Sequence, residues 1–171
     1  TNRLVGSEMC IRDSPKLNEL REKVKNMGFW LPQVSKEYGG LGLSLEQHGE
    51  VSEILGASPY GFYVFNCQAP DAGNMEVLIE TGTEEQKQQY LYPLLEGKIR
   101  SCFAMTEPQY AGSNPTRMGT TAKKENENYI INGHKWFTSS FDGANFAIVM
   151  VVTDPDGCLL YTSDAADDDT R

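Results

Sequence analysis

The spacing of apolar residues changes once along this chain of 171 residues, close to Arg100. Before Arg100, apolar residues recur every three or four positions, which is the period of one buried helix face. After it, they alternate with polar residues or form short unbroken runs, which is the pattern of strands. We therefore predict an α+β fold, with a helical region at residues 15–100 and a β region at residues 101–157.

Capping residues mark the helix ends in the first region. Asp13 or Ser14 would cap a first helix that has Pro15 in its first turn. Ser44 and Thr83 are each followed three residues later by a glutamine, so both predict capping boxes that open helices. Gly97 would end the last of these helices, because glycine readily adopts the left-handed backbone that closes a helix.

A further helix is expected at residues 74–80, and a loop at residues 28–44, which contain Pro32 and the pair Gly39-Gly40. The helix periods also predict which side chains are buried. These are Leu17, Leu20, Val24 and Met27 in the first helix, Leu45, Val51, Ile54 and Leu55 in the second, and Tyr90, Leu91, Leu94 and Leu95 in the last.

The β region begins with "SCFAM", a short apolar run typical of a buried strand. The alternating stretch "TTAKKENENYIINGHKWFTSS" contains two turn signals, at residues 125–128 and at Asn132-Gly133. The run "ANFAIVMVVT" predicts a strand covered on both faces, and residues 154–157 predict a turn.

The two ends of the chain share no period with their neighbours. Residues 1–14 and 158–171 look like translated adapter sequence, and we expect both to be non-native flanks. The alternative for the second segment, which is rich in aspartate, is an acidic interaction tail.

Charge and composition disfavour several classes of function. The net charge of −9 argues against nucleic acid or an anionic membrane as a partner. No apolar run is long enough to span a membrane. The scattered cysteines form no CxxC pair, and His48 and His134 lie far apart, so we expect no metal site. Phosphate-binding glycine loops and paired catalytic carboxylates are also missing from the sequence.

The stretch "FAMTEPQYAGSNPT" is the strongest candidate for a binding site. It leaves the first predicted strand and keeps its side chains short. Thr106 offers a hydroxyl and an amide at the strand end, Gly112 permits close backbone approach, and Ser113 adds a hydroxyl. Such an edge suits a flat polar-rimmed ring or a phosphate, but an ordinary turn containing Pro108 has the same composition.

The order of these motifs decides between the two interpretations. "CFAMTEP", then "AGSN", then "YIINGHKWFTSS" and a strand ending in "TDPDG" resemble the middle domain of the acyl-CoA dehydrogenase family. The upstream segments "EYGGLGLS" and "NCQAPDAGNMEVLIETGTEEQKQQYLYPLLEGKIRS" resemble the end of its helical amino-terminal domain. The long multidomain members are the most similar, and the resemblance covers roughly residues 15–157.

The resemblance implies a helical domain followed by part of a β-barrel-like middle domain, with the family's carboxyl-terminal helical bundle missing. It also implies FAD as cofactor, a fatty acyl-CoA as substrate, an electron-transfer flavoprotein as redox partner and a homo-oligomer for the full-length protein. Family members remove two hydrogens from the α and β carbons of the thioester, and the flavin carries the redox chemistry. Their catalytic glutamate lies in the bundle, so we expect no catalytic residue in this chain and weak FAD retention.

The resemblance also assigns individual residues. Thr106 matches the threonine that bonds the polar edge of the flavin, and Ser113 matches a serine near the cofactor and the substrate thioester. Phe137 matches an aromatic residue, usually tryptophan, that packs on the ring. The full set of expected cofactor-binding residues is Phe103, Ala104, Met105, Thr106, Gly112, Ser113, Phe137, Thr138 and Ser139.

This chain departs from the family pattern at several of these positions. Residues 109–111 make the link after "TEP" one residue longer than in many members, so Gly112 is aligned less firmly than Thr106. Asn114 stands where aspartate is usual.

The same residues leave alternative functions open. Acyl-CoA oxidases and nitroalkane oxidases share the fold and are separated poorly by these residues, and a non-catalytic domain on the same scaffold is a further alternative. Acyl chain length is not readable. The compartment stays open: cytoplasmic in a bacterium, mitochondrial or peroxisomal in a eukaryote.

Overall fold

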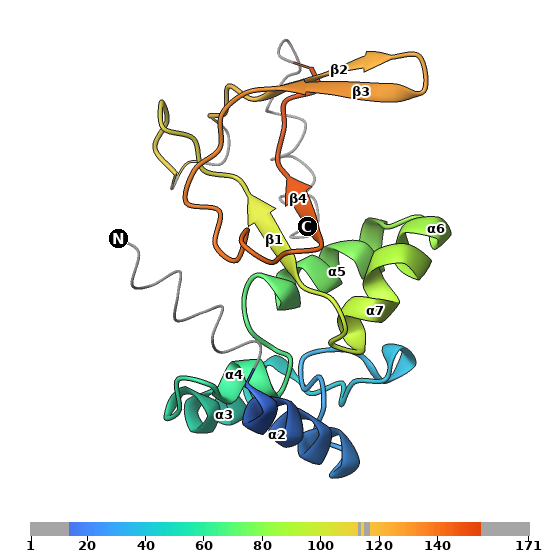
Figure 1. The fold of residues 1–171 in the computed structure, drawn as a ribbon, viewed down its shortest axis with the longest axis vertical. Helices are drawn as coiled ribbons and strands as arrows, with labels where there is room; N and C mark the ends of the chain where they lie inside the picture. Colours follow the sequence, from blue (N-terminus) through green and yellow to red (C-terminus); the bar gives the residue numbers. More distant parts are fainter. Residues whose placement is uncertain (1–13, 113, 115–116, 155–171) are drawn as a thin grey trace, which may run out of the picture. The chain divides into compact units, whose positions relative to one another are not determined.

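The computed structural model describes residues 14–112, 114 and 117–154. It divides the chain into two compact units, which are described separately (Figure 1). The first unit consists of residues 1–103 and 139–148, and the second of residues 104–138 and 149–171. Both predicted flanks lie outside the described residues, except Ser14, as does most of the predicted turn at residues 154–157.

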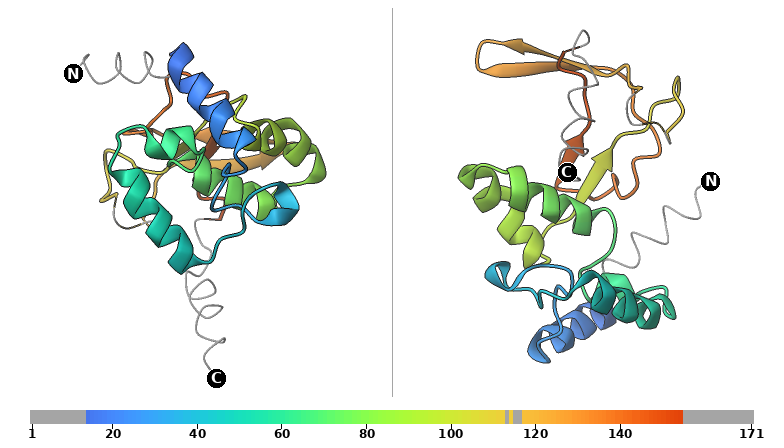
Figure 2. Two further views of the ribbon diagram at one scale, coloured as in Figure 1. Left: turned by 90° about the horizontal axis from the view of Figure 1, so that it is seen from below. Right: turned by 180° about the vertical axis from the view of Figure 1, so that it is seen from behind.

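Helices make up most of the described part of the first unit (Figure 2). Helix α4 packs against both α2 and α3, while α5 packs against the last helical stretch, in which α6, a π-helical turn and α7 follow one another. The bounds are α2 Pro15–Asn26, a 3₁₀ turn Lys36–Tyr38, α3 Leu45–Gly56, α4 Gly61–Val64, α5 Asp71–Thr81, α6 Glu84–Gln86, the π-helical turn Lys87–Leu91 and α7 Tyr92–Leu95.

The predicted helix ends are confirmed, except that Ser14 precedes α2 without making a side-chain capping hydrogen bond. Ser44 and Thr83 both form complete capping boxes, in which the hydroxyl accepts from the N–H group of the glutamine and the glutamine side chain accepts from the cap. Pro15 lies in the first turn of α2, and Gly97 has a left-handed backbone (φ 72°) just beyond α7. The third helix begins earlier than predicted, at Asp71.

The predicted buried faces are only partly right. Leu17, Val24 and Leu55 are buried, but Leu20 and Met27 are exposed. Arg21 is buried in place of these two, because its guanidinium donates to backbone carbonyl oxygens within the unit. In α3, Leu45 and Ile54 are 88% and 73% exposed, so the prediction that they are buried is wrong. The spacing of apolar residues identified an apolar helix face, but no described residue covers these two side chains.

The main core of the first unit lies between α5, α7 and the loop that follows α2. Met75, Leu91 and Leu94 are fully buried, and each contributes roughly 1.5–3 kcal/mol by removal from water. Tyr90 is partly buried and its ring lies 4.8 Å from that of Phe146. The core cluster comprises Leu31, Val34, Met75, Leu78, Leu91, Leu94 and Leu95.

The described strands form two pairs. β1, Ser101–Ala104, pairs with β4, Phe146–Val149. In the second unit, β2, Thr121–Glu125, forms an antiparallel hairpin with β3, Asn128–Asn132. The first predicted turn is confirmed, since the hairpin turns at residues 126–127. The prediction that the last strand is covered on both faces is wrong, because Ala147 is exposed among the described residues.

The second turn signal, Asn132-Gly133, does not close a hairpin. β3 ends at Asn132 and the chain continues without a paired strand. Gly133 is required for a different reason: a Cβ atom at this position would lie 2.2 Å from Oγ1 of Thr120 and 2.6 Å from its Cα. Only glycine allows the chain to pass so close to Thr120.

A buried carboxylate fixes the start of β1 to the start of α5. Asp71 is fully buried and accepts hydrogen bonds from the Ser101 N–H group (2.8 Å) and the Ser101 hydroxyl (2.6 Å). It also forms an ion pair with Nε of Arg100. Asn74 donates to the Ser101 hydroxyl from the next turn of the helix. These bonds satisfy a charge that would otherwise be costly to bury.

We expect Asp71→Ala to lower the free energy of unfolding of the first unit by about 3 kcal/mol or more, because it leaves Arg100 and the Ser101 amide without their partner. Urea unfolding followed by Trp30 fluorescence measures the change. Glu76→Gln, an exposed carboxylate on the same helix, is the matched control and should change stability by less than about 0.5 kcal/mol. Equal effects of the two substitutions would contradict the assignment.

Candidate flavin-binding site

The stretch after β1 folds back so that Gly112 lies against Thr106. A Cβ atom on Gly112 would be 2.9 Å from Cγ2 of Thr106 and 3.3 Å from its Oγ1. These two residues line a small pocket together with Met105, Tyr110 and Met118. The short side chain at position 112 therefore preserves the space around the Thr106 side chain.

Glu107 fastens this strand end to a second segment of the chain. Its carboxylate is only 3% exposed. One oxygen accepts from the Gly119 N–H group (2.6 Å), and the other accepts from the Thr120 N–H group (2.8 Å) and from Nζ of Lys135 (2.8 Å). The carboxylate is thus an anchor for residues 119–120 and for Lys135.

Lys135 fastens the same strand end to a third segment. Besides Glu107, its ammonium group donates to the Met105 carbonyl at 2.8 Å. The next residue, Trp136, donates its N–H group to the Thr106 carbonyl at 3.0 Å. Three consecutive residues, Met105 to Glu107, are therefore held by Lys135 and Trp136. None of these bonds uses the amide or hydroxyl of Thr106.

The carboxylate of Glu107 stays ionised in this environment. Burial alone would raise its pKa, but hydrogen bonds from Lys135 and from the Gly119 and Thr120 amides outweigh it and lower the pKa to about 2. A general base that works near neutral pH needs a pKa much closer to 7. Glu107 is therefore an anchor, and its low pKa makes it a poor proton acceptor near neutral pH.

Phe137 has an unusual backbone and an exposed ring. Its φ of 52° is in the left-handed region, which is uncommon for an aromatic residue, and its side chain is 78% exposed. The ring centroid lies 4.5 Å from that of Trp136. An exposed aromatic residue on a strained backbone points to a role outside the core.

Six of the assigned residues are described in the second unit: Ala104, Met105, Thr106, Gly112, Phe137 and Thr138. It brings Thr106 against Gly112 and ties the segment before Phe137 to the Thr106 carbonyl. Phe103 and Ser139 belong to the first unit, so their position relative to these six residues is not described. Ser113 lies outside the described residues.

Sequence reasoning missed Lys135 and the anchoring role of Glu107. Both residues were visible in the motifs "TEP" and "INGHKW", which are separated by a hairpin. Opposite charges flanking a hairpin can pair, but this signal is too weak to identify a buried ion pair by itself.

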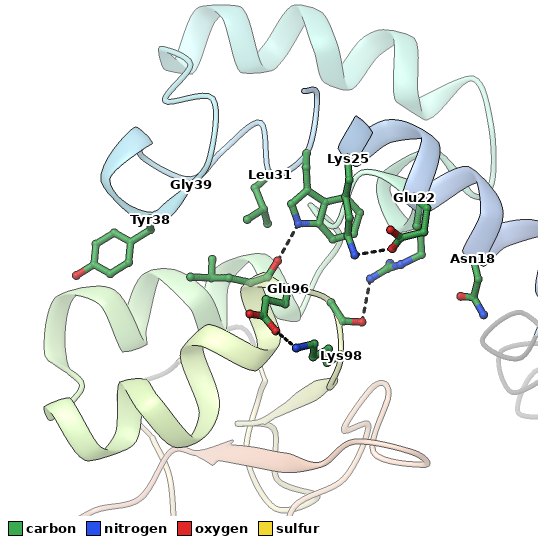
Figure 3. A pocket seen from close by; sticks show the side chains of 12 residues that line it. Asn18, Glu22, Lys25, Leu31, Tyr38, Gly39, Glu96 and Lys98 are labelled. Carbon is green, nitrogen blue, oxygen red and sulfur yellow. Dashed lines mark hydrogen bonds and ion pairs between the residues drawn. The ribbon is translucent and has the colours of Figure 1, made fainter. Parts of the chain in front are cut away.

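A wider cleft of about 600 Å³ lies in the first unit, between α2 and residues 95–98 (Figure 3). Its charged side chains are paired within the chain: Lys25 with Glu22 at 2.7 Å and Lys98 with Glu96 at 2.5 Å. Arg21 donates to two backbone carbonyl groups. Because these charges already have partners, the cleft gives no reason to assign it a ligand.

Two family descriptions match the chain in sequence. The amino-terminal domain of acyl-CoA dehydrogenases matches residues 9–98, and the middle domain of the same family matches residues 102–166. The chain belongs to the acyl-CoA dehydrogenase family. The resemblance found in the motifs and the predicted α+β fold class are thereby confirmed.

Among curated acyl-CoA dehydrogenases, family member 10 of Mus musculus is 47% identical over 150 residues, and family member 11 of Gallus gallus is 45% identical over 141 residues. These matches cover 83% and 81% of this chain, but only 14% and 17% of those proteins. The chain therefore spans a small part of the multidomain relatives that it matches.

Solved acyl-CoA dehydrogenases also share the fold. A protein of Mycobacterium abscessus described as an acyl-CoA dehydrogenase gives a TM-score of 0.80 at 42% identity, over 84% of this chain and 36% of its own. A glutaryl-CoA dehydrogenase of Mycobacterium smegmatis in complex with FADH2 gives 0.62 at 29% identity, over 80% and 34%.

The described part of this acyl-CoA dehydrogenase chain also limits other kinds of site. No helix among the described residues is long and apolar enough to cross a membrane. Residues 14–112, 114 and 117–154 contain no group of three His, Cys, Asp or Glu side chains that could hold a metal ion. Cys67 and Cys102 are free and buried, and burial raises the pKa of the Cys67 thiol to about 11.

The lowered pKa of Glu107 makes a pH prediction. Because the folded value, about 2, lies below the ordinary 4.5, the ionised anchor stabilises the fold fully above about pH 4.5. This contribution is lost as the pH falls toward 2. The difference in unfolding free energy between the wild type and Glu107→Gln should therefore be constant near neutral pH and shrink below about pH 4.5. Carboxyl ¹³C NMR of Glu107 gives the midpoint directly, and a midpoint above 4.5 would contradict the structure.

Proposed function

We propose that this chain supplies the flavin- and thioester-binding part of an FAD-dependent acyl-CoA dehydrogenase. The whole protein would convert a fatty acyl-CoA to the trans-2-enoyl-CoA, as a step of fatty acid β-oxidation. The observation that carries the proposal is the strand end at Thr106, where Gly112 lies against the threonine side chain and the carbonyl is anchored from Trp136.

The residues at this strand end fit a flavin. The edge of the ring presents carbonyl oxygens and ring nitrogens, which require donors and acceptors at a fixed position. The anchoring hydrogen bonds are made to the carbonyl groups of Met105 and Thr106. The amide and the hydroxyl of Thr106 take no part in these bonds. FAD, when bound, would accept the β hydrogen of the substrate as hydride. A solved relative from Mycobacterium smegmatis, glutaryl-CoA dehydrogenase, is in complex with FADH2, which supports the choice of cofactor.

Each assigned residue would bind or orient a ligand and none would transfer a proton. Thr106 would bond the ring edge, Phe137 would pack on the ring, and Ser113 would lie next to the thioester. Phe103, Ala104, Met105, Gly112, Thr138 and Ser139 complete the proposed cofactor contacts. We assign no catalytic base to these 171 residues, because Glu107 is held as an ionised anchor.

An electron-transfer flavoprotein is the proposed acceptor of the electrons, and the whole protein would form homo-oligomers. A solved protein to which this chain is 26% identical, with a TM-score of 0.60, belongs to the ChsE4-ChsE5 complex of Mycobacterium tuberculosis, which supports assembly into oligomers in general.

We expect Thr106→Val to weaken FAD binding about fivefold, because it removes one hydroxyl at nearly constant volume and a hydrogen bond contributes about 1 kcal/mol. Flavin fluorescence during equilibrium titration of the chain with excess FAD measures this, and it detects weak binding that is lost on purification.

Thr153→Val is the matched control, since Thr153 is an exposed threonine of the same unit. It should leave the affinity unchanged. Equal FAD affinity of the wild type and Thr106→Val would refute the role of Thr106. A wild-type chain that shows no quenching of flavin fluorescence at any FAD concentration would count against flavin binding by this part of the protein.

A further inference from the structure

The second unit contains a buried ion pair between Glu107 and Lys135, neither of which is among the residues assigned to contact the flavin. Lys135 is 10% exposed and Glu107 is 3% exposed at the side-chain level, and their charged atoms are 2.8 Å apart. A buried ion pair is rarely the most stable way to fill space, because both charges lose their hydration. Its presence therefore calls for a role other than stability.

The bonds around this pair join three segments at one strand end. Glu107 accepts from Gly119 and Thr120, and Lys135 donates to the Met105 carbonyl. Trp136, the neighbour of Lys135, donates to the Thr106 carbonyl. Thr106 is thus held through the residue on each side of it and through its own carbonyl.

The same bonds fix the chain just before Phe137. Residues 135 and 136 are both anchored, and Phe137 follows with its left-handed backbone. A non-glycine residue keeps this conformation only where its surroundings impose it, because the left-handed backbone is strained. The bonds that hold residues 135 and 136 act on the two positions directly before Phe137, where they can impose this conformation.

We propose that Glu107 and Lys135 are positioning residues, which hold Thr106 and Phe137 in the arrangement that binds the flavin ring. This inference rests on the proposed function, because it assumes that Thr106 and Phe137 contact the cofactor. It adds two residues to the site, neither of which would touch the ring.

The first test measures the anchor without any cofactor. In Glu107→Gln, we expect hydrogen exchange of the Gly119, Thr120 and Trp136 amides to accelerate about tenfold or more by NMR, because the carboxylate that organises them is gone. Glu96→Gln is the control, since Glu96 is an exposed carboxylate that also pairs with a lysine. It should leave these three amides unchanged.

Two outcomes of this test would overturn the proposal. The first is an unchanged exchange rate of the Trp136 amide in Glu107→Gln, which would show that the ion pair does not hold this segment. The second is equal acceleration of amides in α5, such as that of Leu78, which would show a general loss of stability in place of local positioning.

The second test measures the flavin. We expect Glu107→Gln and Lys135→Met each to weaken FAD binding about tenfold and to change the visible circular dichroism of bound flavin at saturation. Lys135→Arg, which keeps the charge, should restore most of the affinity. A merely structural role would lower the folded fraction but leave the spectrum of the saturated complex unchanged.

The outcomes separate the two proposals. If the wild type binds FAD and Glu107→Gln binds it equally well with the same spectrum, the positioning role is wrong and the proposed function stands. If Thr106→Val has no effect on FAD binding while Glu107→Gln weakens it, the role of Thr106 is wrong, and the positioning proposal fails in its Thr106 part. If the wild type binds no FAD, the proposed function fails, and the exchange rates alone decide whether the ion pair holds Trp136.

Discussion

Two buried carboxylates control the short segment from Arg100 to Glu107. Asp71 holds the start of β1 through Arg100 and Ser101, and Glu107 holds the chain after its end through Lys135 and two amides. A charge that has lost its water must be surrounded by donors in fixed places, or the fold pays several kcal/mol. Each carboxylate therefore determines where its donors must lie within its own unit.

This requirement explains why the acid in "TEP" has no part in proton transfer. The donors that make Glu107 an effective anchor are the same donors that lower its pKa to about 2. A carboxylate whose charge holds three segments together has a low pKa. It therefore cannot act as a general base near neutral pH, which would require a raised pKa. A base for acyl-CoA dehydrogenase chemistry would have to be another residue, which agrees with our proposal that this strand end binds the cofactor.

The sequence was informative where a local rule decides the structure. The capping boxes at Ser44 and Thr83 fixed two helix starts, because the cap and its glutamine are only three residues apart. It was uninformative where residues far apart in the sequence determine whether a side chain is buried or a glycine is required. Nothing local indicated that Arg21 is buried while Leu20 is exposed, or that Gly133 is needed against Thr120. The family motifs located Thr106, but Lys135 became visible only when the structure placed it beside Glu107.

The strained backbone of Phe137 links the anchor to the proposed cofactor. An exposed aromatic ring gains little from the protein, and a left-handed backbone costs free energy, so neither feature stabilises the described fold by itself. Both are explained if the ring is kept ready for a flat ligand, because a surface fixed before binding loses less entropy when the ligand arrives. The anchor at Lys135 and Trp136 supplies that fixation at the two residues immediately before Phe137. If the flavin ring binds here as proposed, burying the Glu107–Lys135 pair provides a rigid edge for it.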